Sequence, residues 1–219
     1  TRVPQVLILL TKRPERLLAW QQRYFPQGLP PGVEVGTTAE NQEWADRRVP
    51  ALLQVKATCR FLSCEPLLGP LDLRHIQYDG LIEIDALTGD HGIIRPLSGR
   101  ADTMIHLVIA GGESGTKARP SHPAWFRSLR EQCAAADVLF HFKQWGEYVN
   151  EDDAPDSLFT HDYPSADATM WPDGRVFHGD YDGRDLGRGA KLHRVGKKAA
   201  GRLLDGKLHD ALPPFPSAA

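Results

Sequence analysis

The stretch QVLILLTKRPERLLAWQQRYFPQGLPPGVEVGTT, residues 5–38, decides the fold class. It opens on an apolar run at Gln5–Leu10, and a second run at Val33–Thr37 follows a helical pattern at Pro14–Tyr24. Pro14 suits the first turn of that helix, where proline is tolerated. Continuous apolar runs are typical of strands covered on both faces, as in a parallel sheet. The stretch therefore predicts a β/α/β unit with two parallel strands.

The same alternation continues through the first two thirds of the chain. Further strands are predicted at Cys59–Ser63, Leu107–Ala110 and Val138–Phe142, with helices at Glu43–Val55 and Ser121–Ala136. Five strand–helix units are too few for a closed eight-stranded barrel. They fit either an open doubly wound sheet or the latter part of a (β/α) barrel. We therefore predict an α/β domain at residues 1–147.

Two regions depart from this alternation. A long insertion at 72–106 separates the third and fourth strands, and connections of that length are usually functional or packed excursions. Residues 148–219 begin with an acidic loop, and Met170–Phe177 reads as a β-hairpin around Pro172-Asp173-Gly174. A short helix is predicted at Gly196–Gly206, followed by a frayed tail. We expect this C-terminal part to pack on the α/β domain.

Composition limits the classes of function. The 219 residues carry 26 Lys+Arg and 28 Asp+Glu, a formal charge of -2, which gives no strong signal for nucleic-acid binding. No apolar run approaches the roughly 20 residues that span a bilayer, and we expect a cytoplasmic protein. The chain opens on Thr1 and a strand begins within five residues, so we expect a fragment of a longer protein.

The cysteines do not form a recognisable site. Cys59, Cys64 and Cys133 are scattered, and none belongs to a C-x-x-C pair. This pattern predicts neither a disulfide scaffold nor a zinc ribbon nor an iron–sulfur loop. Cys64 has no histidine partner identifiable from spacing, so we interpret it as a packed thiol.

Polar residues follow all five predicted strands. They are Lys12 and Arg13 after the first, Thr37, Glu40 and Asn41 at and after the second, Ser63 and Glu65 at and after the third, Gly111, Gly112, Glu113 and Ser114 after the fourth, and Lys143, Gln144 and Trp145 after the fifth. Neighbouring strands lie about 4.8 Å apart, so these side chains should crowd one rim of the sheet. Crowded carboxylates and lysines suit acid/base or metal chemistry, although a purely stabilising ring of salt bridges is the alternative.

The sharpest single motif is LVIAGGESG, Leu107–Gly115. Its two adjacent glycines would let a ligand approach the backbone, whose N–H groups could hold a carboxylate or phosphate, while Glu113 could pair with an amino group. A tight turn without a ligand is the alternative. The motif is neither G-x-G-x-x-G nor a P-loop, so neither nucleotide-binding mechanism is indicated. Trp145 either stacks on a flat substrate or caps the fold.

Six motifs occur in order along the chain: LLTKRPERL (9–17), VGTTAENQ (35–42), RFLSCEPLLGPLDL (60–73), LVIAGGESGTKARP (107–120), FHFKQWGE (140–147) and GKKAAGRLLDG (196–206). Together they resemble a phage and bacterial family of unknown function that is related to radical SAM enzymes. Members look like (β/α) barrels of the radical-SAM/TIM type, with an upstream three-cysteine motif for a [4Fe–4S] cluster that activates S-adenosylmethionine.

The resemblance implies that this chain is the C-terminal part of such an enzyme. The three-cysteine motif is absent, so the chain alone should bind no cluster and be inactive. Thr116-Lys117 also stands where a Pro-Gly-like turn is expected.

The resemblance also assigns roles at the rim, with an unknown small-molecule or macromolecular substrate. The catalytic candidates are Lys12, Glu65 and Lys143; the cofactor-binding candidates are Glu40, Asn41, Gly111, Gly112, Glu113 and Ser114; the substrate-binding candidates are Arg13, Thr37, Ser63, Gln144 and Trp145. No metal ligand is assigned.

Two alternatives remain open. The first is a metal-dependent lyase or hydrolase, which requires Glu40, Glu65 and Glu113 to converge on one point. The second is a non-catalytic phage accessory or binding module, which predicts a large exposed apolar edge. In a fragment of a barrel, Val6, Ile8 and Leu10 would belong to a strand with one uncovered edge. We therefore expect self-association through that edge.

Overall fold

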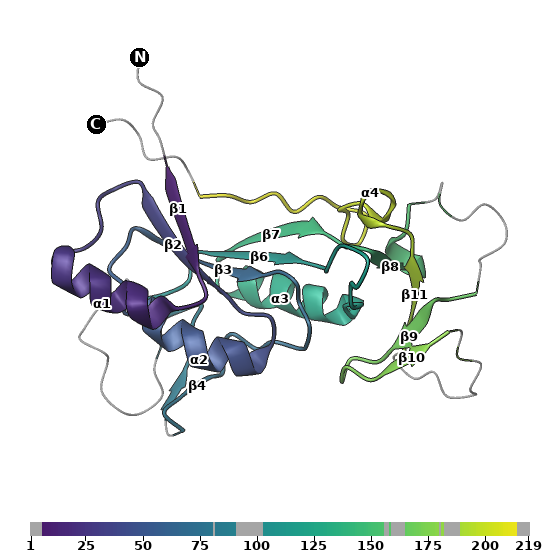
Figure 1. The fold of residues 1–219 in the computed structure, drawn as a ribbon, viewed down its shortest axis with the longest axis horizontal. Coiled ribbons are helices and arrows are strands. Elements are labelled where there is room, and N and C mark those ends of the chain that lie inside the picture. The colour runs from purple at the N-terminus through teal and green to yellow at the C-terminus, as the bar shows by residue number, and fades with distance from the viewer. Residues whose placement is uncertain are drawn as a thin grey trace, which may run out of the picture.

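The chain folds around a five-stranded parallel sheet (Figure 1). Our computed structural model describes residues 6–80, 82–90, 103–155, 158, 165–179, 181 and 189–213. The strands are β1 (Leu7–Thr11), β2 (Val33–Thr38), β3 (Cys59–Cys64), β6 (Leu107–Gly111) and β7 (Leu139–Gln144). Their spatial order is β1-β2-β3-β6-β7, and every pair is parallel. The mixed α/β class and the parallel pairing predicted from the apolar runs are confirmed.

Three helices connect the strands and cover the sheet. They are α1 (Pro14–Tyr24), α2 (Gln42–Leu53) and α3 (Pro123–Ala135). Pro14 and Pro123 stand in the first turns of α1 and α3, where a missing N–H costs nothing. The Asn41 side chain caps α2 by accepting from the Trp44 N–H at 3.1 Å. Strands in sequential order with right-handed crossovers place such helices on a common face.

The main core lies between this helical layer and the sheet. Its buried members include Val35, Leu52, Leu62, Val108, Phe126 and Phe142. Burial of side chains of this size contributes about 1.5–3 kcal/mol each. The same cluster includes Val149, Met170 and Leu192 from the C-terminal part of the chain. Side chains of the C-terminal part therefore share one buried cluster with the parallel sheet.

The sheet is open. Within the described residues β1 pairs only with β2, and β7 does not return to β1, so no closed barrel forms. Five strands are too few to complete an eight-stranded barrel. The outer side of β7 is covered by the C-terminal segment of the chain. Phe142 donates its N–H to the His209 carbonyl at 2.9 Å, and His141 forms an antiparallel bridge with Asp210. Figure 1 shows this C-terminal segment running beside β7.

A smaller antiparallel sheet follows the last parallel strand. It has the order β10-β9-β11-β8 and comprises β8 (Tyr148–Asn150), β9 (Ala168–Met170), β10 (Val176–His178) and β11 (Ala190–Arg194). Met170 pairs with Val176, which confirms the predicted hairpin. A 3-10 turn, η1, spans Glu151–Asp153. The predicted helix at 196–206 is shorter than expected: α4 covers only Lys197–Ala200, because Gly201 at φ +73° leaves the helical conformation.

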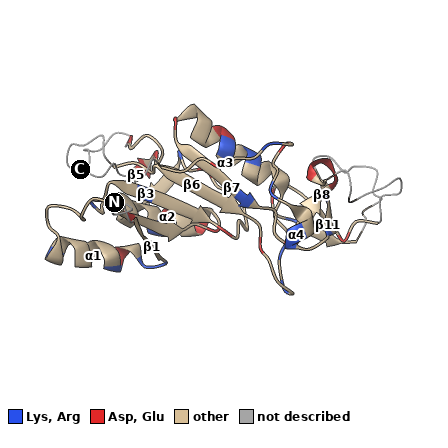
Figure 2. Cartoon of the chain, turned by 90° about the horizontal axis from the view of Figure 1, so that it is seen from above, with Lys and Arg blue, Asp and Glu red and all other residues tan. Residues whose placement is uncertain are grey.

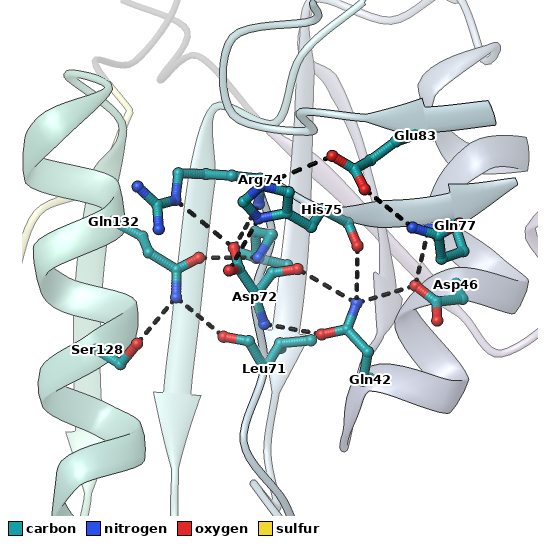
Figure 3. A network of polar contacts seen from close by, with 11 residues as sticks. Gln42, Asp46, Leu71, Asp72, Arg74, His75, Gln77, Glu83, Ser128 and Gln132 are labelled. Atoms are coloured by element: carbon teal, nitrogen blue, oxygen red, sulfur yellow. Dashed lines mark hydrogen bonds and ion pairs between the residues drawn. The ribbon is translucent and has the colours of Figure 1, made fainter. Parts of the chain in front are cut away.

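The insertion between β3 and β6 begins with a hairpin of β4 (Ile76–Tyr78) and β5 (Ile82–Ile84). Two glutamines anchor its first residues (Figure 3). Gln132 of α3 donates to the Leu71 carbonyl at 2.9 Å and accepts from the Leu73 N–H at 2.8 Å. Gln42 of α2 accepts from the Asp72 N–H at 2.8 Å. The entry to the insertion is thus fixed to two helices.

None of the helices that the structure describes combines the length and apolar character needed to cross a lipid bilayer.

Candidate functional site

The carboxyl ends of the five parallel strands form a rim, as the sequence predicts. Charges gather at strand ends and on helices, whereas the strands themselves are mostly uncharged (Figure 2). Lys12, after β1, contacts Glu40, after β2, at 2.8 Å. Lys143, near the end of β7, contacts Glu65, after β3, at 2.8 Å. Side chains far apart in sequence therefore meet at one edge of the sheet.

Glu40 is the most enclosed carboxylate of the rim. It accepts from Lys12 Nζ at 2.8 Å through Oε1 and from Arg48 Nη1 at 2.7 Å through Oε2. Arg48 also donates to the carbonyl and hydroxyl oxygens of Thr38 and lies 4.0 Å from the ring centre of Trp44. Burial alone would raise the pKa of Glu40, but the Lys12 hydrogen bond, a backbone hydrogen bond and the charges of Arg48 and Lys12 lower it overall. Glu40 is therefore an ionised anchor with two cations.

Glu65 joins three strand ends. Its Oε2 accepts from Lys143 Nζ, and its Oε1 accepts from Gln144 Nε2 at 2.9 Å. The same carboxylate lies against Gly111, where an added side-chain carbon would approach Oε1 to 3.3 Å. The predicted residues Glu65, Lys143, Gln144 and Gly111 are thus brought together.

Glu113 is held by a residue that sequence reasoning missed. The Arg119 guanidinium donates to both of its carboxylate oxygens at 2.8 Å, and the Arg119 N–H donates to Oε2. The Arg119 hydrogen bond is the largest influence on the pKa of Glu113 and lowers it. No spacing rule singles out Arg119, since its pairing depends on the turn between the two residues.

The loop after Glu113 is tied to the smaller sheet. Glu147 accepts from the Gly115 N–H at 3.0 Å, and Arg194 of β11 donates to the carbonyls of Gly115 and Thr116. Ser114 lies exposed in this loop. The two sheets are therefore connected at the rim.

The glycine pair is explained by a close approach of the chain to itself. The Gly112 N–H donates to the Gln144 carbonyl at 3.0 Å, and a side-chain carbon at Gly112 would overlap the Trp145 carbonyl. At this position the approaching backbone is that of the loop after β7. The tight-turn alternative therefore accounts for Gly112 without a ligand.

Several other predicted residues have structural contacts. Trp145 is 2% exposed, packs against Phe126 and Phe142, and donates its indole N–H to the Leu203 carbonyl at 2.7 Å. Its ring therefore belongs to the core. Thr37 donates to the Thr11 carbonyl at 2.8 Å.

Two of the substrate-binding candidates, Ser63 and Arg13, differ in their exposure to solvent. Ser63 is buried at the end of β3, whereas Arg13 is exposed before α1. The structure therefore does not bring Arg13 to the enclosed part of the rim.

The three carboxylates of the metal hypothesis do not converge. Glu40, Glu65 and Glu113 each bind different cationic residues, and the described residues include no group of three His, Cys, Asp or Glu side chains placed to hold a metal ion. The convergence that this hypothesis requires is therefore not met in the described part of the chain.

The thiols are equally unsuited to ligation. Cys59, Cys64 and Cys133 are buried and free, and burial raises the pKa of Cys59 to about 11 and that of Cys133 to about 12. Burial likewise raises the pKa of Cys64. These side chains are buried packing groups, and the described residues place no three of the His, Cys, Asp or Glu side chains together for a metal, so they do not fit a [4Fe–4S] cluster.

One groove opens between the rim and the β9–β10 hairpin, and we call it the rim groove. It has a volume of about 620 Å³ and is lined by Glu40, Asn41, Trp44, Leu68, Ala118, Arg119, Pro120, Tyr148, Met170, Gly174, Val176 and His178. Two aromatic rings, a carboxylate and an exposed guanidinium thus share one cavity. The contribution of the β9–β10 hairpin to the rim groove could not be predicted, because no sequence signal indicates where a hairpin packs.

Comparison with known protein families identifies a match over most of the chain. The family described as "Protein of unknown function (DUF5131)" matches residues 3–213. No curated protein and no solved structure matches significantly. Since the family match covers nearly the whole sequence, this chain is a member of the DUF5131 family of unknown function.

Proposed function

We propose that the chain binds a small molecule with a flat ring and charged groups in the rim groove. The observation that carries this proposal is the grouping of Trp44, Tyr148, Arg119 and Glu40 around one cavity of about 620 Å³. Cavities of this size are typical of small-ligand sites, in which a few polar groups orient the ligand. The C-terminal ends of parallel strands are also the usual ligand-binding edge of α/β folds.

S-adenosylmethionine is the ligand that the motif resemblance suggests. Its adenine could contact the rings of Trp44 or Tyr148, and its carboxylate could meet Arg119, whose side chain is 61% exposed. The rings that line the rim groove support this choice, and Arg119 would bind the carboxylate while it keeps its ion pair with Glu113. The described residues do not fit the iron–sulfur cluster.

The proposal assigns different roles to the cofactor and to the chain. When bound, S-adenosylmethionine would supply the chemistry, which is the cofactor's own. The chain described here would bind and orient. Glu40, with its two cations, holds the N-terminal end of α2 in place, and the Arg119–Glu113 pair fixes the guanidinium that faces the cavity.

Calorimetric titration with S-adenosylmethionine, S-adenosylhomocysteine, adenosine and methionine tests the proposal. We expect the first two ligands to bind, and Trp44→Leu to weaken them about tenfold. Arg119→Gln should weaken the carboxylate-bearing ligands while leaving adenosine unchanged. Trp20→Leu is the matched control, since Trp20 lies exposed on α1 and does not line the rim groove.

Two results would contradict the proposal. One is the absence of binding by all four ligands at millimolar concentration. The other is an equal loss of affinity in Trp44→Leu and Trp20→Leu, which would show that the ligand does not sit in the rim groove.

A further inference from the structure

Both the tryptophan and the tyrosine that line the rim groove have arginines beside their rings. The Arg48 guanidinium lies 4.0 Å from the ring centre of Trp44, and that of Arg47 lies 5.1 Å from the same centre. On the smaller sheet, the Arg194 guanidinium lies 5.9 Å from the ring centre of Tyr148. Aromatic faces attract cations within about 6 Å. These two rings therefore already have cations of the chain itself as neighbours.

Other contacts hold these arginines in place. Arg47 forms an ion pair of 2.8 Å with Glu43. Arg194 donates to the carbonyls of Gly115 and Thr116, at 3.2 and 2.7 Å. A cationic ligand could therefore displace a guanidinium from its ring only at the expense of these contacts.

The charged side chains of the rim groove differ in how much bonding capacity they have left. Glu40 is the one carboxylate among the described residues that line the groove. Its side chain is 10% exposed, and its two oxygens already accept from Lys12 and Arg48. The Arg119 side chain is 61% exposed, and Glu113 takes two of the five N–H groups that a guanidinium carries. The groove thus has donors left for an anion, whereas its carboxylate is already paired.

We propose that the rim groove selects ligands whose flat ring carries an anionic group and no positive charge. This inference rests on the proposed function and names the charge class of the ligand. An uncharged ring would stack on Trp44 or Tyr148, and its anionic group would bind Arg119. A cationic group beside the rings would be repelled by the neighbouring arginines, and it would find Glu40 already paired.

Two pairs of ligands that each differ by one charged group test the proposal in calorimetric titrations. Adenosine 5′-monophosphate differs from adenosine by its phosphate, and S-adenosylmethionine differs from S-adenosylhomocysteine by a methyl group that creates a sulfonium cation. We expect the phosphate to strengthen binding about tenfold and the sulfonium to weaken it about fivefold, with both differences shrinking at high salt. Inorganic phosphate alone should bind at least about tenfold more weakly than the monophosphate, because ring stacking supplies part of the affinity.

Arginine variants test the cause of the preference. Arg47→Gln and Arg194→Gln each remove a charge beside a ring and should reduce the preference for S-adenosylhomocysteine to about twofold. Both side chains are exposed, so the circular dichroism spectrum should be unchanged. Arg175→Gln is the matched control: its guanidinium lies 5.4 Å from the ring centre of Trp171, but neither residue lines the rim groove. This variant should leave the preference unchanged.

The outcomes separate this inference from the proposed function. Equal binding of adenosine and its monophosphate, or S-adenosylmethionine binding at least as tightly as S-adenosylhomocysteine, would overturn the inference and leave the proposed function intact. A preference that is unchanged in both Arg47→Gln and Arg194→Gln would also overturn it. Absence of binding by all four ring-bearing ligands would overturn the inference and the proposed function together.

Discussion

The two outer strands of the parallel sheet have similar apolar sequences but opposite environments. In β7, Phe140 and Phe142 are 7% and 0% exposed, and the C-terminal segment hydrogen-bonds to the outer side of that strand. In β1, Ile8 and Leu10 are more than half exposed. An apolar run therefore predicts a strand, but the amount of burial depends on segments that lie far away in the sequence.

The largest expected difference between the two edges is in packing. Phe142→Ala should lower the free energy of unfolding by about 4 kcal/mol, because it empties a site between Phe126 and Trp145. Leu10→Ala should lower it by less than about 1 kcal/mol, since half of that side chain already contacts water. Urea denaturation of both variants measures the difference. Equal losses would show that β1 is as well covered as β7.

The next difference is in the stability that two rim carboxylates, Glu40 and Glu65, contribute. Glu40→Gln, near β1, should cost about 3 kcal/mol at pH 7, because it leaves the buried Arg48 without its carboxylate. Glu65→Gln, near β7, should cost less than about 1 kcal/mol, since the side chain of its partner Lys143 is 52% exposed. Chemical denaturation of the two variants makes the comparison.

The contribution of Glu40 should also depend on pH. The pKa of Glu40 is lower in the folded chain than its ordinary value, so the unfolded chain binds the proton more readily. The contribution is thus fully present above the unfolded pKa and is lost as pH falls through the folded pKa. Thermal unfolding between pH 7 and pH 3 should show the wild-type curve approaching that of Glu40→Gln. A constant difference across this range would contradict the assignment.

A further difference between the two edges concerns the segment that covers β7. Ending the chain after Gly206 removes the residues that bond to His141 and Phe142 and should cost about 2 kcal/mol. It should also convert β7 into a second uncovered edge, so that sedimentation shows new concentration-dependent association. A truncated chain with unchanged stability would show that the segment does not protect β7.

The sequence predicted the parallel layer well because its signals are local. The apolar runs LILLT of β1 and LVIAG of β6 are local signals, and α1 begins at Pro14 as its first-turn proline predicts. The convergence of polar residues at the rim followed from parallel geometry alone. At this rim, Lys12 contacts Glu40 and Lys143 contacts Glu65.

Features that depend on distant contacts could not be predicted. Trp145 has the same sequence context whether it faces a ligand or the core, and only the position of Leu203 shows which applies. The glycines at 111 and 112 signal a close approach, but the sequence does not say whether a ligand or the chain itself approaches. The strands β8 and β11 are three and five residues long, and their pairing spans roughly forty residues of intervening chain.

The pair of glutamines at the start of the insertion has a consequence for how sequences in this family can diverge. Gln42 and Gln132 bind main-chain groups, so they hold the chain at residues 71–73 whatever side chains stand there. Because the amide side chains are neutral at any ordinary pH, these hydrogen bonds do not depend on pH. Beyond residues 71–73, related proteins would be free to lengthen, shorten or replace the insertion while the rim of the sheet stays in register.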